Sequence, residues 1–315
     1  MKKILLSFLG LCLLVLGLSA CSTTKEEVKI GFLKGPTGMG AAYLMAQNED
    51  KKTKNIYDFT IAGAVDELTG RLISGDLDMA ALPTNLIATL NSKTDGEIQI
   101  LGVNTLGVLY IIENGSTINS LADLEGKTIL ASGKGSTAEH ILNYILVENE
   151  VTVEMVWASE HSEAATQLLN GNYTIAMLPE PFVTTVTSKD QNFKVAINLS
   201  EEWGKLDVGE LMMGGIAVRK TFVQEHEQAV KNFVKEYQSS VNYVNKNLKA
   251  AADLIEKYDI AKASVAEAAL PRCNIVWKHG TSYKEPLTNF LGVLYAAKPM
   301  SVGGKLPTAD FYLNY

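Results

Sequence analysis

Hydrophobic and polar residues alternate along this chain in two rhythms that take turns. Short apolar runs such as 28–33 (VKIGFL) and 77–83 (LDMAALP) are typical of buried strands, and turn residues bound them. Segments between these runs space their apolar residues as an amphipathic helix does, as in 65–75 (VDELTGRLISG). Strands that alternate with helices at this spacing form βαβ units with parallel pairing. The pattern therefore predicts an α/β fold.

The predicted order of strands and helices runs once and then restarts. The first series has strands at 28–33, 57–63, 77–83 and 98–104, with helices at 38–49, 65–75 and 84–92. The second series has strands at 128–133, 153–159, 173–179 and 193–199, with helices at 120–127, 136–148, 162–171 and 180–188. Two series of this kind predict two similar α/β lobes.

The remaining C-terminal segment changes in character. A glycine-hinged strand at 212–220 leads into a long amphipathic helix at 227–248, and the segments after it read as helices without strands. Helices need a sheet to cover, so we expect this part to return to the first lobe. We predict that lobe 1 comprises 28–112 plus 213–315 and that lobe 2 comprises 113–212, with the connections 107–113 and 211–218 crossing between them.

The N-terminus has the features of an export signal. The basic start MKK is followed by 17 largely apolar residues, which is marginal for a membrane span, so we predict a signal peptide at 1–20. The quartet LSAC at 18–21 resembles the bacterial lipobox, which implies cleavage before Cys21 and lipidation of its thiol. Residues 21–27 would then be a lipidated cysteine and a polar tether, and two acyl chains suffice for stable anchoring. A secretory signal or a membrane anchor with an incidental cysteine is the alternative.

Cysteine count and charge limit the possibilities further. Cys12 leaves with the predicted signal and Cys21 would carry lipid, so Cys273 has no partner for an intramolecular disulfide. The roughly 295 residues that remain can bury a sizeable core and suit two lobes. The formal charge of −7 becomes −9 when Lys2 and Lys3 are removed, and scattered acidic charge argues against nucleic acid as a partner. We expect a monomer.

One twelve-residue pattern occurs twice, at 75–86 (GDLDMAALPTNL) and at 171–182 (GNYTIAMLPEPF). Each copy has a glycine that ends a helix, a buried strand, and a proline that suits the first turn of the next helix. The two copies are identical at four of the twelve positions. The alternative explanation is that this pattern is common to α/β proteins in general. The copies differ where the second has Glu180-Pro181 and the first has Thr84-Asn85, so we expect recognition to differ there.

Ligands of open parallel sheets bind beyond the carboxyl ends of the strands, close to helix N-termini. Two glycine-rich loops occupy matching places after the first strand of each lobe, GPTGMG at 35–40 and SGKGST at 132–137. Glycine allows close backbone approach, and free N–H groups with the helix dipole attract an anion or a carbonyl-rich group. Plain helix capping is the alternative, as for Ser136 with Glu139. The candidate ligand-binding residues are Thr37, Gly38, Met39 and Asn85 in lobe 1, and Gly135, Ser136, Thr137 and Glu180 in lobe 2.

Catalytic and cofactor motifs are not supported by the sequence. The GKT at 126–128 lacks the preceding glycine of a P-loop, and GPTGMG does not have the dinucleotide-binding spacing. The four histidines show no metal-ligand spacing, and no C-x-x-C occurs. We therefore expect no cofactor, no metal and no catalysis.

These residues together resemble a known family. The lipobox, KIGFLKGPTGMG, the two G-x-x-x-x-A-x-L-P units, SLADLEGKTI and the tail VGGKLPTADFY resemble substrate-binding lipoproteins of ABC importers, in the nitrate, sulfonate, taurine and thiamine-precursor group. The resemblance covers essentially the whole mature chain. It implies a type II periplasmic-binding-protein fold, in which two α/β lobes close on a small molecule and deliver it to a membrane permease.

The resemblance leaves the ligand open. Members that bind sulfonates or pyrimidines have a longer loop after the first strand, whereas this loop is short, so a sulfonate, nitrate, pyrimidine, flavin or other molecule remains an alternative. Two other functions also stay open. One is an enzyme of the pyrimidine-synthase-like branch of the fold, and the other is a surface interaction protein without a transport role.

Overall fold

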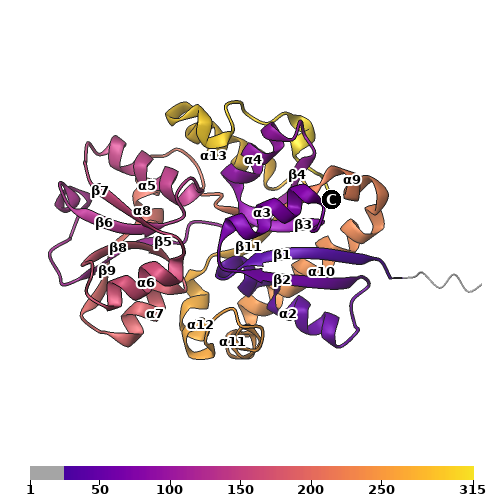
Figure 1. Cartoon of the computed structure of the whole chain (residues 1–315), viewed down its shortest axis with the longest axis horizontal. Coiled ribbons are helices and arrows are strands. Elements are labelled where there is room, and N and C mark those ends of the chain that lie inside the picture. The colour runs from indigo at the N-terminus through magenta and orange to yellow at the C-terminus, as the bar shows by residue number, and fades with distance from the viewer. Residues whose placement is uncertain (1–24) are drawn as a thin grey trace, which may run out of the picture.

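Two separate β-sheets, each covered by helices, form the two lobes of the computed structural model (Figure 1). The structure describes residues 25–315, so the predicted signal peptide, Cys21 and most of the tether lie outside the described residues. Within 25–315 no helix combines the length and the apolar character needed to cross a membrane.

Six strands form the sheet of lobe 1 in the order β11–β4–β10–β3–β1–β2. Their bounds are β1 (Glu27–Leu33), β2 (Ile56–Ala62), β3 (Met79–Pro83), β4 (Ile98–Thr105), β10 (Gly214–Arg219) and β11 (Ile275–His279). Five strands form the sheet of lobe 2 in the order β7–β6–β8–β5–β9. Their bounds are β5 (Leu109–Asn114), β6 (Thr128–Ser132), β7 (Glu154–Ala158), β8 (Ile175–Pro179) and β9 (Phe193–Asn198).

The sheets are mixed rather than purely parallel. β1 pairs in parallel with β2 and β3, and β6 pairs in parallel with β7 and β8, as βαβ units require. β10 pairs antiparallel with β3 and β4, and β5 pairs antiparallel with β8 and β9. β5 and β10 each follow a passage of the chain from one sheet to the other, so they enter their new sheet from the cleft side, and β11 also pairs antiparallel with β4.

Helices cover the sheets and join the lobes. Those between the strands are α2 (Pro36–Glu49), α3 (Val65–Ser74), α4 (Thr84–Lys93), α5 (Thr137–Glu148), α6 (His161–Leu169), α7 (Phe182–Lys189), α8 (Leu199–Lys205) and the 3-10 helix η1 (Leu121–Leu124). The C-terminal part adds α9 (Lys220–Glu225), α10 (Glu227–Lys246), α11 (Leu248–Lys257), α12 (Ala263–Ala269) and α13 (Lys284–Ala297), with the 3-10 helices η2 (Leu270–Arg272), η3 (Pro299–Val302) and η4 (Ala309–Phe311).

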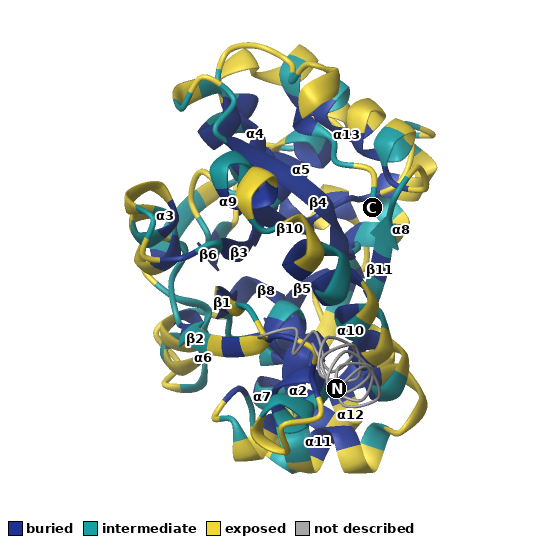
Figure 2. Cartoon of the chain, turned by 90° about the vertical axis from the view of Figure 1, so that its right-hand side faces the viewer, coloured by how far each residue is buried: buried dark blue, intermediate teal, exposed yellow. Residues whose placement is uncertain are grey.

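The strands carry the buried core, and the outer helix faces are exposed (Figure 2). In lobe 1, α10 packs on α2 over the sheet, and the rings of Phe32, Phe233 and Tyr237 stack within this layer. Between the lobes, the buried Trp203 of α8 lies 5.3 Å from Tyr144 of α5 and 5.7 Å from Phe290 of α13, measured between ring centroids. These aromatic contacts tie the C-terminal helices to lobe 2 as well as to lobe 1.

Three elements differ from the sequence prediction. The segment 107–113, expected as a connection, contains strand β5, and the predicted lobe limit after residue 112 falls inside it. The prediction that strands stop after 212–220 is wrong, because β11 forms the edge of the first sheet. Helix α8 was not predicted. All three are short elements whose pairing or packing partners lie far away in sequence, so local pattern carries little signal for them.

Candidate ligand-binding site

A cavity of about 140 Å³ lies between the two lobes at the carboxyl ends of the strands. Loops from both lobes line it, as the switch-point rule for α/β sheets requires. An engineered cavity of about 150 Å³ holds benzene, so this space suits a molecule of about one six-membered ring. Its apolar wall consists of Leu33, Pro36, Ala64, Val65, Leu82, Pro83, Val108, Leu109, Ala138, Pro179, Phe182 and Met213.

A serine and a histidine of lobe 2 form a polar pair on the cavity wall. Ser132 ends β6 and His161 begins α6, and the Ser132 hydroxyl bonds to Nδ1 of His161. Burial lowers the pKa of His161 to about 4, so its imidazole is neutral at neutral pH. Nε2 makes no hydrogen bond within residues 25–315. The pair therefore offers a ligand a neutral ring nitrogen held in a defined orientation.

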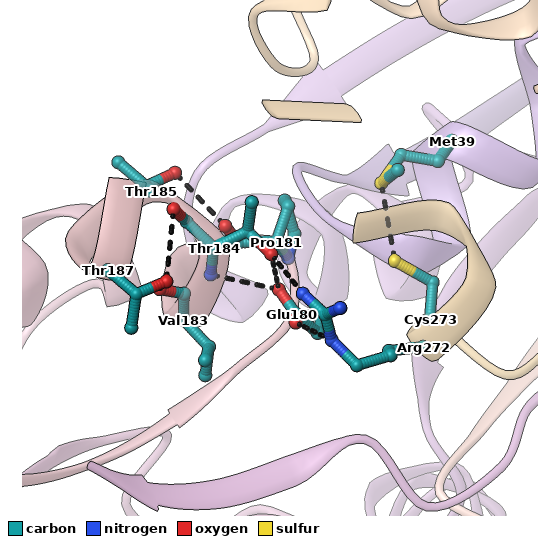
Figure 3. A network of polar contacts seen from close by, with 9 residues as sticks. All are labelled: Met39, Glu180, Pro181, Val183, Thr184, Thr185, Thr187, Arg272 and Cys273. Atoms are coloured by element: carbon teal, nitrogen blue, oxygen red, sulfur yellow. Dashed lines mark hydrogen bonds and ion pairs between the residues drawn. The ribbon is translucent and has the colours of Figure 1, made fainter. Parts of the chain in front are cut away.

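A buried carboxylate closes another part of the wall and joins the lobes. Glu180, which is 0% exposed, follows β8 in lobe 2, and its Oε1 accepts a hydrogen bond from Nε of Arg272 at 2.7 Å. Its Oε2 accepts from the backbone N–H of Thr184 at 3.0 Å and from the Thr184 hydroxyl at 2.8 Å (Figure 3). Arg272 belongs to η2, just before β11 of lobe 1, and its side chain is 48% exposed. Both oxygens of Glu180 are thus occupied by protein groups.

Two further charged side chains border the cavity. Lys34 of lobe 1 pairs with Asp259 at 2.9 Å, and its side chain is 38% exposed. Glu160 of lobe 2 is half-buried, accepts a hydrogen bond from the Ser162 hydroxyl at 2.9 Å, and lies across the cleft against Gly63. A Cβ atom added at Gly63 would come within 3.0 Å of Glu160 Oε2, so this close approach of the lobes relies on glycine.

Four of the eight predicted ligand residues line the cavity. Thr37 contributes from lobe 1, and Ser136, Thr137 and Glu180 contribute from lobe 2. Ser136 caps α5 by accepting a hydrogen bond from Ala138 N–H at 3.2 Å. Ser136 therefore both caps helix α5 and lines the cavity.

The other four predicted residues lie elsewhere. Gly38 is buried and a Cβ there would meet the Leu33 carbonyl oxygen at 2.7 Å, while Met39 is fully buried in the core, where its sulfur lies 4.0 Å from Cys273 Sγ. The rotation of the helix explains this correction, since α2 begins at Pro36 and turns Met39 toward the sheet. Asn85 and Gly135 contact each other, because Asn85 Nδ2 donates to the Gly135 carbonyl at 3.0 Å across the lobes.

Sequence reasoning missed Ser132, Glu160, His161 and Arg272. Ser132, Glu160 and His161 lie in or beside the loops that follow predicted strands, so their position at strand ends was an available signal. Arg272 lies 92 residues from Glu180 in a segment of 3-10 helix, and no local pattern indicates their pairing. Among the described residues, no group of three or more His, Cys, Asp or Glu side chains is placed to hold a metal ion.

Two α/β lobes with a solvent-accessible cavity at their facing strand ends define the class of the two-lobed binding proteins. A family model described as ABC transporter, phosphonate, periplasmic substrate-binding protein matches residues 45–268. No curated protein sequence matches the chain.

Solved structures share the fold at low sequence identity. An ABC transporter protein from Parabacteroides distasonis has a TM-score of 0.77 at 21% identity and covers 92% of this chain and 99% of its own. The alkanesulfonate-binding protein SsuA from Xanthomonas axonopodis pv. citri, bound to MOPS, has a TM-score of 0.71 at 15% identity, covering 90% and 96%. The periplasmic nitrate-binding protein NrtA from Synechocystis PCC 6803 has a TM-score of 0.65 at 13% identity, covering 91% and 84%.

The chain belongs to the phosphonate ABC-transporter family of periplasmic substrate-binding proteins. It is the extracytoplasmic solute-binding component of an ABC transporter, as the resemblance in its sequence indicated. Proteins of this kind bind small ligands and deliver them to a permease.

Proposed function

We propose that this protein is anchored to the outer face of the cell membrane by lipid on Cys21, and that it captures one small molecule between its lobes as a monomer without catalysis. The observation that supports capture is the cavity whose wall both lobes supply. The lobes, with limits near 28–112 plus 213–315 and 113–212, would move as units about the two chain passages. Thr37, Ser136 and Thr137 from the predicted set, with Ser132 and His161, would face the ligand.

If the protein captures a small molecule, we expect that molecule to bind to the purified protein. Purified protein should release a small molecule on denaturation, which mass spectrometry would detect, and adding that molecule back should raise the melting temperature. A ligand at 100 times its dissociation constant adds about 2.7 kcal/mol to the free energy of unfolding. Absence of any released molecule, together with no thermal shift from a panel of small solutes, would contradict capture.

The Ser132–His161 pair supports binding rather than hydrolysis. A serine nucleophile needs a general base whose pKa lies near the working pH, and a histidine with a pKa of about 4 is a weak base at neutral pH. A triad would also hold the second ring nitrogen with a carboxylate, and within 25–315 Nε2 of His161 has no such partner. The pair is therefore better suited to orient a ligand through hydrogen bonds than to cleave one.

The proposed anchor makes a prediction about processing. Cys21→Ala removes the thiol that would receive lipid, so we expect a larger precursor that still carries residues 1–20 and lacks lipid. Metabolic labelling with a radioactive fatty acid and the size of the product on a gel would check this, with Cys12→Ala as the matched control. Normal size and labelling of the Cys21→Ala protein would refute lipidation at this residue.

A further inference from the structure

Glutamate side chains accept hydrogen bonds from backbone N–H groups at or just before the start of four helices that border the cavity. Backbone N–H groups at a helix start are what a protein uses to bind phosphate-like anions. Around this cavity, a glutamate side chain accepts from such groups at four helices. The pairs are Glu67 with Gly63 and Ala64 at α3, Glu139 with Gly135 at α5, Glu163 with Ser159 at α6, and Glu180 with Thr184 at α7.

These four carboxylates act twice against an anionic ligand. They occupy one or two N–H groups at each of these helix ends, and they place negative charge where the helix dipole would otherwise attract an anion. Helices α2 and α4 differ, because neither has an acidic residue in its first turn. Helix α2 begins with Pro36, which lacks an N–H group, and the N–H of Thr84 at the start of α4 donates to the Met213 carbonyl at 3.0 Å. Lys34, the cationic side chain on the cavity wall, is paired with Asp259.

One charged side chain on the cavity wall has no ion-pair partner within residues 25–315. Lys34 is matched by Asp259 and Glu180 by Arg272, whereas no ion pair within 25–315 includes Glu160. Glu160 borders the cavity and lies against Gly63 of lobe 1. Its carboxylate accepts from the Ser162 hydroxyl and has remaining capacity for further donors. The rest of the wall is largely apolar.

We propose that the cavity recognises a compact molecule of about one ring, with an apolar body and a cationic nitrogen group, ammonium or amidinium, that binds Glu160. The proposal rests on the proposed capture function and names its substrate class. In charge, this substrate class is the opposite of a phosphonate or a sulfonate. His161 offers the ligand a second polar contact, and the apolar wall encloses its body.

Two probes of similar size and opposite charge test the proposal on the purified full-length protein. Benzamidine carries an amidinium and phenylphosphonate carries an anion on the same ring. We expect benzamidine to raise the melting temperature and to give a dissociation constant by calorimetry, and phenylphosphonate to do neither. Glu160→Gln should weaken benzamidine binding at least about tenfold, because it removes a hydrogen bond to a charged group. Glu154→Gln, the same charge change at an exposed position on β7, should leave binding unchanged.

The outcomes distinguish the substrate class from the capture function. Stabilisation by phenylphosphonate and not by benzamidine would overturn the cationic class and leave capture intact. Equal benzamidine affinity in Glu160→Gln and the parent would also overturn it, provided that the two unliganded proteins melt alike. If benzamidine has no effect and purified protein releases no small molecule, capture fails and the inference fails with it.

Discussion

Arg272→Met should weaken binding of the released native ligand about 30-fold, which corresponds to about 2 kcal/mol. The reason is that Arg272 of lobe 1 is the cationic partner of Glu180, a carboxylate of lobe 2 that is 0% exposed in this arrangement of the lobes (Figure 3). Removing one partner of a fully buried pair typically costs about 3–5 kcal/mol, and the half-exposed Arg272 side chain places this case below that range.

The loss should appear in closure, because opening the lobes returns Glu180 to water. Small-angle scattering of the ligand-bound protein would then show a larger radius for Arg272→Met. Arg219→Met is the matched control, since Arg219 pairs with Asp78 at 4.0 Å within lobe 1. It should lower the free energy of unfolding without changing the affinity. Unchanged affinity in Arg272→Met would show that this ion pair does not support closure.

The double variant Arg272→Met with Glu180→Met tests whether the affinity lost in Arg272→Met comes from leaving the Glu180 carboxylate buried without a partner. Replacing both partners by apolar groups often costs little, because no uncompensated charge remains buried. We therefore expect the double variant to bind more tightly than Arg272→Met alone. If the double variant loses as much affinity as the two single variants do in sum, Arg272 and Glu180 are not energetically coupled and the pair does not support closure.

His161 should make the protein less stable in mild acid, by about 3 kcal/mol between pH 6.5 and pH 4. Burial lowers its pKa from the ordinary value of 6.5 to about 4. Between those values the unfolded chain binds a proton that the native state does not, so the free energy of unfolding falls as the pH is lowered. Below pH 4 both states are protonated and this contribution changes no further.

Urea unfolding at pH 7, 5.5 and 4 on the parent and on His161→Gln measures this contribution. Acidic groups elsewhere titrate equally in both proteins, so their effects cancel in the difference. Glutamine keeps a hydrogen-bonding partner for Ser132 and does not titrate. Parallel pH profiles for the two proteins would mean that His161 does not have the lowered pKa.

Local pattern was sufficient for most of the scaffold. Strand–helix alternation placed β1 to β4 and β6 to β9 close to their observed positions, because period-two and buried apolar runs are properties of neighbouring residues. The same pattern missed β11 (IVWKH), although Ile275, Val276 and Trp277 are strand-forming types. Five residues are too few to outweigh the helical segments around them until β4 supplies a pairing partner.

In the candidate site, the sequence predicted the loops correctly but not which side chains face the cavity. Sequence placed the correct loops at the cleft, since strand ends and glycine turns are readable locally. It could not tell that Thr37 faces the cavity while Met39 faces the core, because that depends on where α2 begins and which side packs on the sheet. It also assigned Glu180 to a ligand, whereas its oxygens bind Thr184 and Arg272.

The sequence by itself determined two α/β series, the family, and the loops that border the cleft, because periodicity, turn residues and motifs are short-range properties of the chain. Only the tertiary structure decided the antiparallel entry strands, the interlobe pairing of Arg272 with Glu180 and the contact of Ser132 with His161. These contacts join residues that are brought together when the two sheets face each other, and their energies depend on burial that no single segment has alone. The position of Glu160 on the cavity wall, without an ion-pair partner among residues 25–315, also exists only in that arrangement.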